Sequence, residues 1–350
     1  MDKVHAGHHK NKGFMYFERI MIEPTSTCTM GCSWCPHPKM SRRKAHAEKE
    51  SLLTTIEEIA RSGMTGRVAV VGVGEPLANP EYENIIENAR SLGLEVSLQT
   101  NGYSLSRLAK VKGKVLELRI SLQTITAAAY RTKNYSVAFE KYLSTILDFV
   151  VQHADYHKVV LSVLLIRNNP IKYLFIGAED HRPIFLQIFR LRDFVNRLSA
   201  LMNAGVIRFN PLLDNRIDIT PNLEVNIDEF VPWLGDVDLF ENEDAHVASR
   251  TRRTPGGCRL FKSGSMILSD GRVCMCCRDA EGRTAVGQLE RGKGLADILN
   301  SDKYGRIHRA FEKEDIIDPF CQLCKGANRY KFPVNILDFF DRRLMNRVLV

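Results

Sequence analysis

The sequence predicts an α/β fold in which buried strands alternate with amphipathic helices. Strand-like segments rich in apolar residues recur over the first 212 residues, and segments with apolar residues at helical spacing separate them. Strands joined by helices form right-handed parallel crossovers, and strands buried on both faces have continuous apolar sequences. At 350 residues, the chain is long enough to bury such a core and to carry a second, smaller unit.

The expected elements follow one another regularly along this first part of the chain. Gly63 and Gly93 end the first two helices, and Asn101-Gly102 forms a turn after the third strand. The alternation implies a parallel α/β barrel, closed or open. The expected strands are 20–23, 67–72, 94–99, 115–122, 158–167 and 205–212, and the expected helices are 47–62, 79–93, 104–111, 136–152 and 185–203.

Composition and charge exclude several classes of protein. No apolar run approaches the roughly 20 residues that cross a bilayer, and the polar, basic first 13 residues do not resemble a signal peptide. We therefore expect a cytoplasmic protein without a membrane partner. The formal charge is +8, but the basic residues are scattered apart from short clusters such as 41–44, which favours solvated surface over nucleic-acid binding.

The nine cysteines indicate metal binding rather than disulfides, because a reducing compartment keeps thiols free. Cys28, Cys32 and Cys35 directly follow the first expected strand. Three thiolates can hold three irons of a cubane iron–sulfur cluster, which leaves one iron open to a ligand from outside the protein. A zinc knuckle completed by His37 is the alternative.

The CxxxCxxC spacing, with Trp34 before the third cysteine, resembles the radical S-adenosylmethionine (radical SAM) superfamily. The resemblance implies a partial (β/α)6 barrel, which matches the six expected strands. It also implies a 4Fe-4S cluster on Cys28, Cys32 and Cys35, whose open iron binds the amino and carboxylate groups of SAM. An electron from that cluster cleaves SAM and releases a 5'-deoxyadenosyl radical.

The expected SAM contacts lie at the carboxyl ends of the strands, where parallel barrels carry their chemistry. Gly74-Glu75-Pro76 resembles the family's GGEP motif. A carboxylate there accepts a charge-assisted hydrogen bond from the SAM amino group, and glycine permits close backbone approach. Hydrogen bonding within the strand ends is the alternative for the later polar residues. The implied cofactor-binding set is Trp34, Gly74, Glu75, Pro76, Ser97, Gln99, Asn101 and Ser121.

The remaining cysteines predict a second iron–sulfur site. Asp270-Gly271 indicates a hairpin that brings Cys258 near the cysteines at 274–277, and a helical stretch over 294–312 leads to a CxxC pair. Four thiolates can fully ligate a 4Fe-4S cluster, whereas a zinc ribbon is the alternative. The pattern resembles the SPASM/twitch domain, in the twitch form with one auxiliary cluster. The implied ligands are Cys258, Cys276, Cys321 and Cys324, with Cys276 preferred over Cys274 and Cys277.

The expected organisation has five parts. A polar tail (1–15) precedes the barrel (16–213), and an acidic, partly structured linker (214–255) leads to the SPASM/twitch domain (256–330) and a tail (331–350).

The resemblance implies an oxidoreductase of natural-product biosynthesis, similar to the twitch aminocyclitol dehydrogenases and reduced by a flavodoxin- or ferredoxin-type donor. The auxiliary cluster would accept an electron from a sugar-like or aminocyclitol-like substrate; no side chain is assigned as the base. Crosslinking, epimerisation or oxidation of a ribosomal peptide is an alternative, less favoured because only about 20 residues precede the first strand. Carbohydrate epimerisation needs a hydrogen donor, commonly a thiol, and only Cys274 and Cys277 are not assigned to a cluster. A non-enzymatic binding protein leaves the incomplete cysteine set unexplained.

Overall fold

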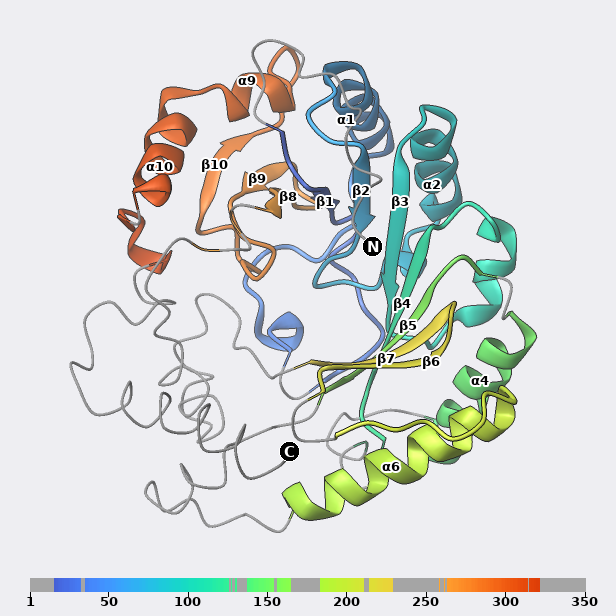
Figure 1. The fold of residues 1–350 in the computed structure, drawn as a ribbon. Helices are drawn as coiled ribbons and strands as arrows, with labels where there is room; N and C mark the ends of the chain where they lie inside the picture. Colours follow the sequence, from blue (N-terminus) through green and yellow to red (C-terminus); the bar gives the residue numbers. More distant parts are fainter. Residues whose placement is uncertain are drawn as a thin grey trace, which may run out of the picture.

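The computed structural model describes residues 16–32, 35–125, 127, 130, 137–153, 156–164, 183–210, 214–228, 258, 261, 263–313 and 315–321. Both expected tails, 1–15 and 331–350, therefore lie outside the described residues. Within them, one ten-stranded sheet has the order β10-β9-β8-β1-β2-β3-β4-β5-β7-β6 (Figure 1). The predicted α/β class is confirmed, with a large parallel sheet at its centre.

The parallel part of the sheet follows the chain from β1 to β5 and then continues with β7. These strands are β1 (Ile20–Ile22), β2 (Arg67–Val70), β3 (Glu95–Thr100), β4 (Glu117–Gln123), β5 (Val159–Leu164) and β7 (Leu223–Asp228). β6 (Arg216–Thr220) pairs antiparallel with β7. On the other side, β8 (Met266–Ile267) runs parallel to β1, and β9 (Arg272–Cys274) and β10 (Ala285–Gln288) continue the sheet antiparallel.

Helices α1, α2, α4 and α6 lie on the outer side of the curved sheet (Figure 1). They span Lys49–Ser62, Tyr82–Ser91, Phe139–Gln152 and Pro183–Leu201, close to the predicted ranges. The expected helix at 104–111 is instead a 3-10 helix, η3 (Leu105–Val111). Two further short 3-10 helices are η1 (His37–Lys39) and η2 (Pro76–Ala78).

The helical stretch expected over 294–312 consists of two helices, α9 (Leu295–Leu299) and α10 (Asp302–Glu312). Ser301 separates them, because its hydroxyl accepts a hydrogen bond from the backbone N–H of Tyr304 and so caps the start of α10.

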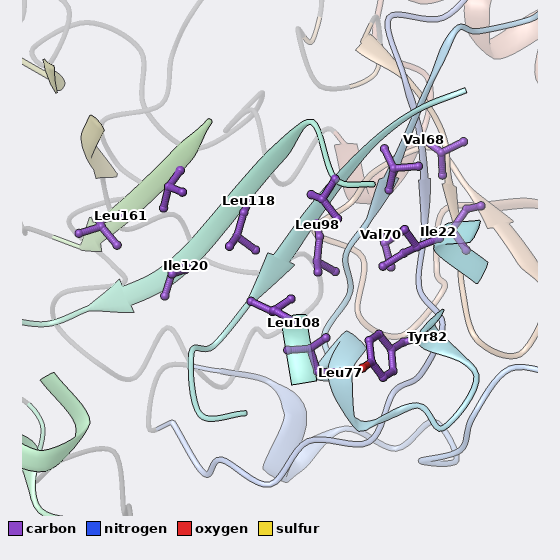
Figure 2. Close-up of a cluster of buried hydrophobic side chains, with 14 of the residues drawn as sticks. Ile22, Val68, Val70, Leu77, Tyr82, Leu98, Leu108, Leu118, Ile120 and Leu161 are labelled. Carbon is purple, nitrogen blue, oxygen red and sulfur yellow. The ribbon is translucent and has the colours of Figure 1, made fainter. Parts of the chain in front are cut away.

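The two faces of the parallel sheet differ in chemistry because successive side chains point to opposite sides. The outer face is apolar and forms the core beneath the helices. Figure 2 shows its residues Ile22, Val68, Val70, Leu98, Leu118, Ile120 and Leu161 together with Leu77, Tyr82 and Leu108. The inner face carries polar residues on β3, β4 and β5, such as Ser97, Gln99, Ser121 and Ser162, and a separate apolar cluster near β1, β8 and β9.

The structure corrects the expected sixth strand. Residues 205–210 form no strand, although Ile207 and Phe209 pack against the core. The strand beside β5 is β7, paired from Val159↔Leu223 onward. Both β6 and β7 lie in the segment predicted as a linker, so its described part, 214–228, extends the sheet. β7 alternates apolar and polar residues because only its outer side faces the core.

A search of the described helices finds none with both the length and the apolar character needed to span a membrane.

Candidate functional site

The first cysteine group lies in the loop between β1 and α1 (residues 23–48, the cysteine loop), at the carboxyl end of β1. Cys28, Cys32 and Cys35 are half-buried and form no disulfide. The backbone N–H of Met30 donates to Cys28 Sγ at 3.4 Å, and Asn101 Nδ2 lies 3.8 Å from the same sulfur. Burial raises the pKa of Cys28 to about 11, and the neighbouring Glu75 and Cys32 add to the shift.

This donor set has the right chemistry for an iron–sulfur cluster. Soft thiolates are its protein ligands, and N–H groups directed at a sulfur are typical of its surroundings. Among the described residues, no three Cys, His, Asp or Glu side chains converge on a metal position. Thiol ligands lose their protons when they bind a metal. His37, the fourth ligand of the zinc alternative, is buried and hydrogen-bonded to the backbone of Ser26.

The loop after β2 packs directly against the cysteine loop. A Cβ placed on Gly74 would lie 2.2 Å from Thr25 O and 2.7 Å from Thr27 O. The backbone N–H of Glu75 donates to Thr27 O at 2.8 Å. Gly74 therefore permits a close approach of the chain's own backbone, and its predicted contact with SAM stays a prediction.

Glu75 links the loop after β2 to the end of β3. Its carboxylate is 5% exposed and accepts hydrogen bonds from Leu77 N (3.2 Å), Thr100 Oγ1 (2.7 Å) and Asn101 N (2.7 Å). Burial raises the pKa of this carboxyl above its ordinary value, while the three donors act in the opposite direction. Pro76, also buried, begins η2 directly after it. The role of Glu75 as acceptor for the SAM amino group stays a prediction.

The other predicted SAM contacts occupy two neighbouring places. Ser97 and Gln99 on β3 share the inner face with Ser121 on β4, and Gln99 Nε2 donates to Ser121 Oγ at 3.0 Å. Asn101 lies further along, where its carbonyl accepts a hydrogen bond from Tyr142 Oη at 2.7 Å while its side chain reaches Cys28. Trp34 lies outside the described residues.

The second cysteine group begins with the hairpin predicted at Asp270-Gly271, which joins β8 and β9. Cys276 is buried near Cys258 and hydrogen-bonded to Cys277; this bond, burial and the charge of Cys258 raise its pKa. The same bond lowers the pKa of Cys277 to about 7. Cys274 is fully buried in the inner apolar cluster.

The choice of Cys276 over Cys274 and Cys277 as the ligand stays a prediction. Cys321 lies at the end of the described chain, where its N–H donates to Asp318 Oδ1 at 3.0 Å, and Cys324 lies outside the described residues.

A buried ion pair beside the cysteine loop was missed by sequence reasoning. Glu23 follows β1 and is 0% exposed, and Arg42 Nη1 and Nη2 donate to its two carboxylate oxygens at 2.7 and 3.0 Å. Arg42 belongs to the basic cluster 41–44 that was predicted as solvated surface, yet its side chain is 2% exposed. The one sequence signal was a glutamate directly after an apolar strand.

Comparison with known proteins agrees with both cysteine groups. Residues 22–168 match the radical SAM superfamily, and residues 258–325 match the iron–sulfur cluster-binding SPASM domain. The uncharacterised protein MJ0804 of Methanocaldococcus jannaschii is 26% identical over 189 residues, which are 53% of this chain and 61% of that protein. The PqqA peptide cyclase of Streptomyces rochei is 32% identical over 88 residues, 25% of this chain and 24% of the cyclase.

The chain thus covers less than two thirds of the length of these relatives. Among solved structures, BtrN in complex with AdoMet and 2-DOIA has a similar fold, with a TM-score of 0.50 and 15% identity over 86% of this chain and 89% of BtrN.

Proposed function

Because the chain belongs to the radical SAM superfamily and carries a SPASM domain, we propose that it oxidises a small hydroxylated molecule by hydrogen-atom abstraction. A radical SAM domain implies a 4Fe-4S cluster and SAM, and a SPASM domain implies auxiliary iron–sulfur binding. Enzymes of this superfamily take their electron from a flavodoxin or ferredoxin. We assign Cys28, Cys32 and Cys35 to the SAM cluster, and Cys258, Cys276, Cys321 and Cys324 to the auxiliary cluster.

The bound cofactors supply a 5'-deoxyadenosyl radical that takes a hydrogen atom from carbon, and the auxiliary cluster supplies an electron acceptor. For a secondary alcohol, loss of this hydrogen atom, of the hydroxyl proton and of one electron gives a ketone and 5'-deoxyadenosine.

The observation that carries the proposal is the pairing of β8 with β1. Met21 pairs with Met266 and Ile22 with Ile267, so the SPASM domain continues the sheet whose β1 leads into the cysteine loop. The cysteine loop follows β1, and Cys276 follows β9, which pairs with β8, so the two groups are attached to nearby strands of one sheet. This arrangement supports an electron acceptor held in a fixed place relative to the radical chemistry.

The inner face of the sheet supports a hydroxylated ligand. Ser97, Gln99, Ser121 and Ser162 bring hydroxyl and amide groups to the face opposite the helix-covered core. Such groups donate to and accept from sugar-like hydroxyls and the ribose of SAM. Glu75 positions Asn101, whose amide reaches Cys28.

Peptide modification is the second candidate, favoured by the 32% identity to a PqqA peptide cyclase. Carbohydrate epimerisation is less favoured, because Cys274 is buried in the inner apolar cluster and Cys277 packs against that cluster beside the Cys276 thiol.

The test uses anaerobically reconstituted protein and a variant with Cys28, Cys32 and Cys35 all changed to Ala. We expect about eight irons in the parent and about four in the variant, with SAM cleavage by the parent only. The parent is then incubated with deuterated cyclitols and with peptides. Deuterium in 5'-deoxyadenosine together with a ketone product supports the dehydrogenase. Deuterium transfer from peptides alone would support the second candidate, and absence of SAM cleavage would refute both.

A further inference from the structure

We propose that the turn 276–281 of the SPASM domain forms one wall of the SAM-cluster site, and that Arg42 and Glu281 are positioning residues that couple the two cluster sites. This inference rests on the proposed binding of a cluster at each cysteine group. It predicts that occupancy of the auxiliary site changes the affinity of the first site for SAM.

Arg42 holds both domains at once. Besides its pair with Glu23, its Nη1 donates to Ser269 Oγ at 2.9 Å and its Nε donates to Ala280 O at 2.8 Å. Glu23 in turn accepts from the backbone N–H groups of Val73 (3.0 Å) and Ser269 (2.9 Å). One buried ion pair therefore joins the cysteine loop, the loop after β2 and the SPASM hairpin.

Glu281 makes a second connection from the same turn. Its carboxylate accepts hydrogen bonds from Ser41 N (2.7 Å), Ser41 Oγ (2.8 Å) and Arg42 N (3.1 Å). These bonds lower the pKa of Glu281 against the opposing effect of its partial burial, so the carboxylate is ionised at neutral pH. The backbone on the carboxyl side of Cys35 is thus held by a side chain from the other domain.

Apolar packing brings the same turn to a cluster ligand. Met40, Val73 and Ala280 form a small buried cluster, and Cys35 packs against it. Ala280 is 1% exposed and contributes both this side chain and the carbonyl that accepts from Arg42. A SPASM residue is therefore part of the surroundings of the third cysteine of the cysteine loop.

The turn also contains the predicted auxiliary ligand. Cys276 O accepts from Asp279 N at 3.2 Å, and Cys276 Sγ accepts from Arg278 N at 3.4 Å. Asp279 Oδ2 accepts from Thr284 N and Thr284 Oγ1 and so closes the turn. Because Ala280 directly follows Asp279, whose N–H is bonded to Cys276 O, a cluster held by Cys276 would restrain the turn that holds Arg42.

A role in positioning explains why the pair is ionic. Replacing a buried ion pair with apolar residues is often neutral or stabilising, so stability alone does not account for it. The planar guanidinium fixes three groups in three loops with defined geometry, which an apolar contact does not.

The test is a double-mutant cycle on the reconstituted holoenzyme, read as the SAM dissociation constant from the change that SAM makes in the EPR spectrum of the reduced first cluster. One variant, Cys276→Ala with Cys321→Ala, empties the auxiliary site, and Glu281→Ala cuts the connection. We expect each variant to raise the SAM dissociation constant roughly tenfold. The combined variant should show no further increase over either one alone.

Glu58→Ala is the matched control. Glu58 on α1 also joins the two domains, because its carboxylate accepts from Leu295 N (2.8 Å) and Ala296 N (2.7 Å) at the start of α9. Its contacts are with α9 rather than with the cysteine loop, so Glu58→Ala should change SAM affinity by no more than about twofold. In the variant with the emptied auxiliary site, its effect on SAM affinity should be the same as in the parent.

Independent, additive effects of Glu281→Ala and the emptied site would overturn the proposal, as would equal effects of Glu281→Ala and Glu58→Ala. Hydrogen exchange of residues 41–45 in the cluster-free chain gives a second measurement: Glu281→Ala should accelerate it and Glu58→Ala should not. A parent that binds no SAM would instead refute the proposed function.

Discussion

Substituting Gly74 with alanine should destabilise the chain and displace the cysteine loop. The added Cβ would lie 2.2 Å from Thr25 O, whereas ordinary contacts begin at 3.4 Å, so this backbone must move by about 1.2 Å. Overpacking of this kind costs about 1–3 kcal/mol. The movement also strains the bond from Glu75 N to Thr27 O, worth about 0.5–1.5 kcal/mol. We therefore expect a loss of about 2–4 kcal/mol in the free energy of unfolding.

Urea unfolding of the cluster-free chain, followed by circular dichroism, measures this loss, and iron content after reconstitution reports on the loop. Gly66→Ala is the matched control, because nothing lies within 4 Å of its added Cβ. It should be neutral or stabilise by up to about 1 kcal/mol. If the two variants unfold at the same urea concentration with equal slopes, the packing argument for Gly74 is refuted.

The remaining predictions concern single side chains. In Glu75→Gln an amide group replaces one of the accepting carboxylate oxygens, and the free energy of unfolding should fall by about 1–3 kcal/mol. Because burial raises the pKa of Glu75, its contribution to parent stability is greatest below the ordinary carboxyl pKa and falls as pH rises through the raised value; urea titrations across acidic pH should show this slope in the parent only. Cys276→Ala should lower the iron content by up to about four per chain while Cys274→Ala leaves it unchanged, as measured by iron analysis. Tyr142→Phe removes the hydrogen bond to Asn101 O and should cost about 0.5–1.5 kcal/mol in urea unfolding; no change would contradict its role.

The strands that could be predicted are those with a local apolar signal. β1, β2 and β5 are mostly apolar, β3 and β4 alternate apolar and polar residues, and each of the five was located to within a few residues. β7, Leu-Glu-Val-Asn-Ile-Asp, alternates apolar and polar residues as β3 and β4 do, and it was missed because it lies in the acidic segment that was predicted as a linker. Pro221 and Asn222 between two alternating runs were a hairpin signal that could have located β6 and β7. The apolar residues at 207 and 209 instead suggested a strand where the structure has none.

The candidate site was predictable in its residue types but not in its contacts. Spacing identified the two cysteine groups, and the resemblance to the GGEP motif identified the Gly-Glu-Pro turn. The partners of Glu75, at the end of β3, depend on which strands become neighbours, and the sequence does not encode that locally. Arg42 and Arg43 look equivalent in sequence, yet only Arg42 faces a buried carboxylate, and that carboxylate follows β1. Contacts between residues far apart in the sequence therefore decide which polar side chains become buried and hydrogen-bonded.

The pairing of β8 with β1 has a consequence for biosynthesis. The N–H groups of Arg19, Met21 and Glu23 donate to carbonyls of residues 263, 265 and 267, so this side of the first strand is satisfied by residues made about 245 positions later. Until those residues leave the ribosome, β1 has an unpaired edge, and unpaired edges template aggregation. Glu23 also lacks Ser269 until then. Assembly of the cysteine loop is therefore ordered in time: the nascent chain completes the walls of its first site only after its second domain has emerged.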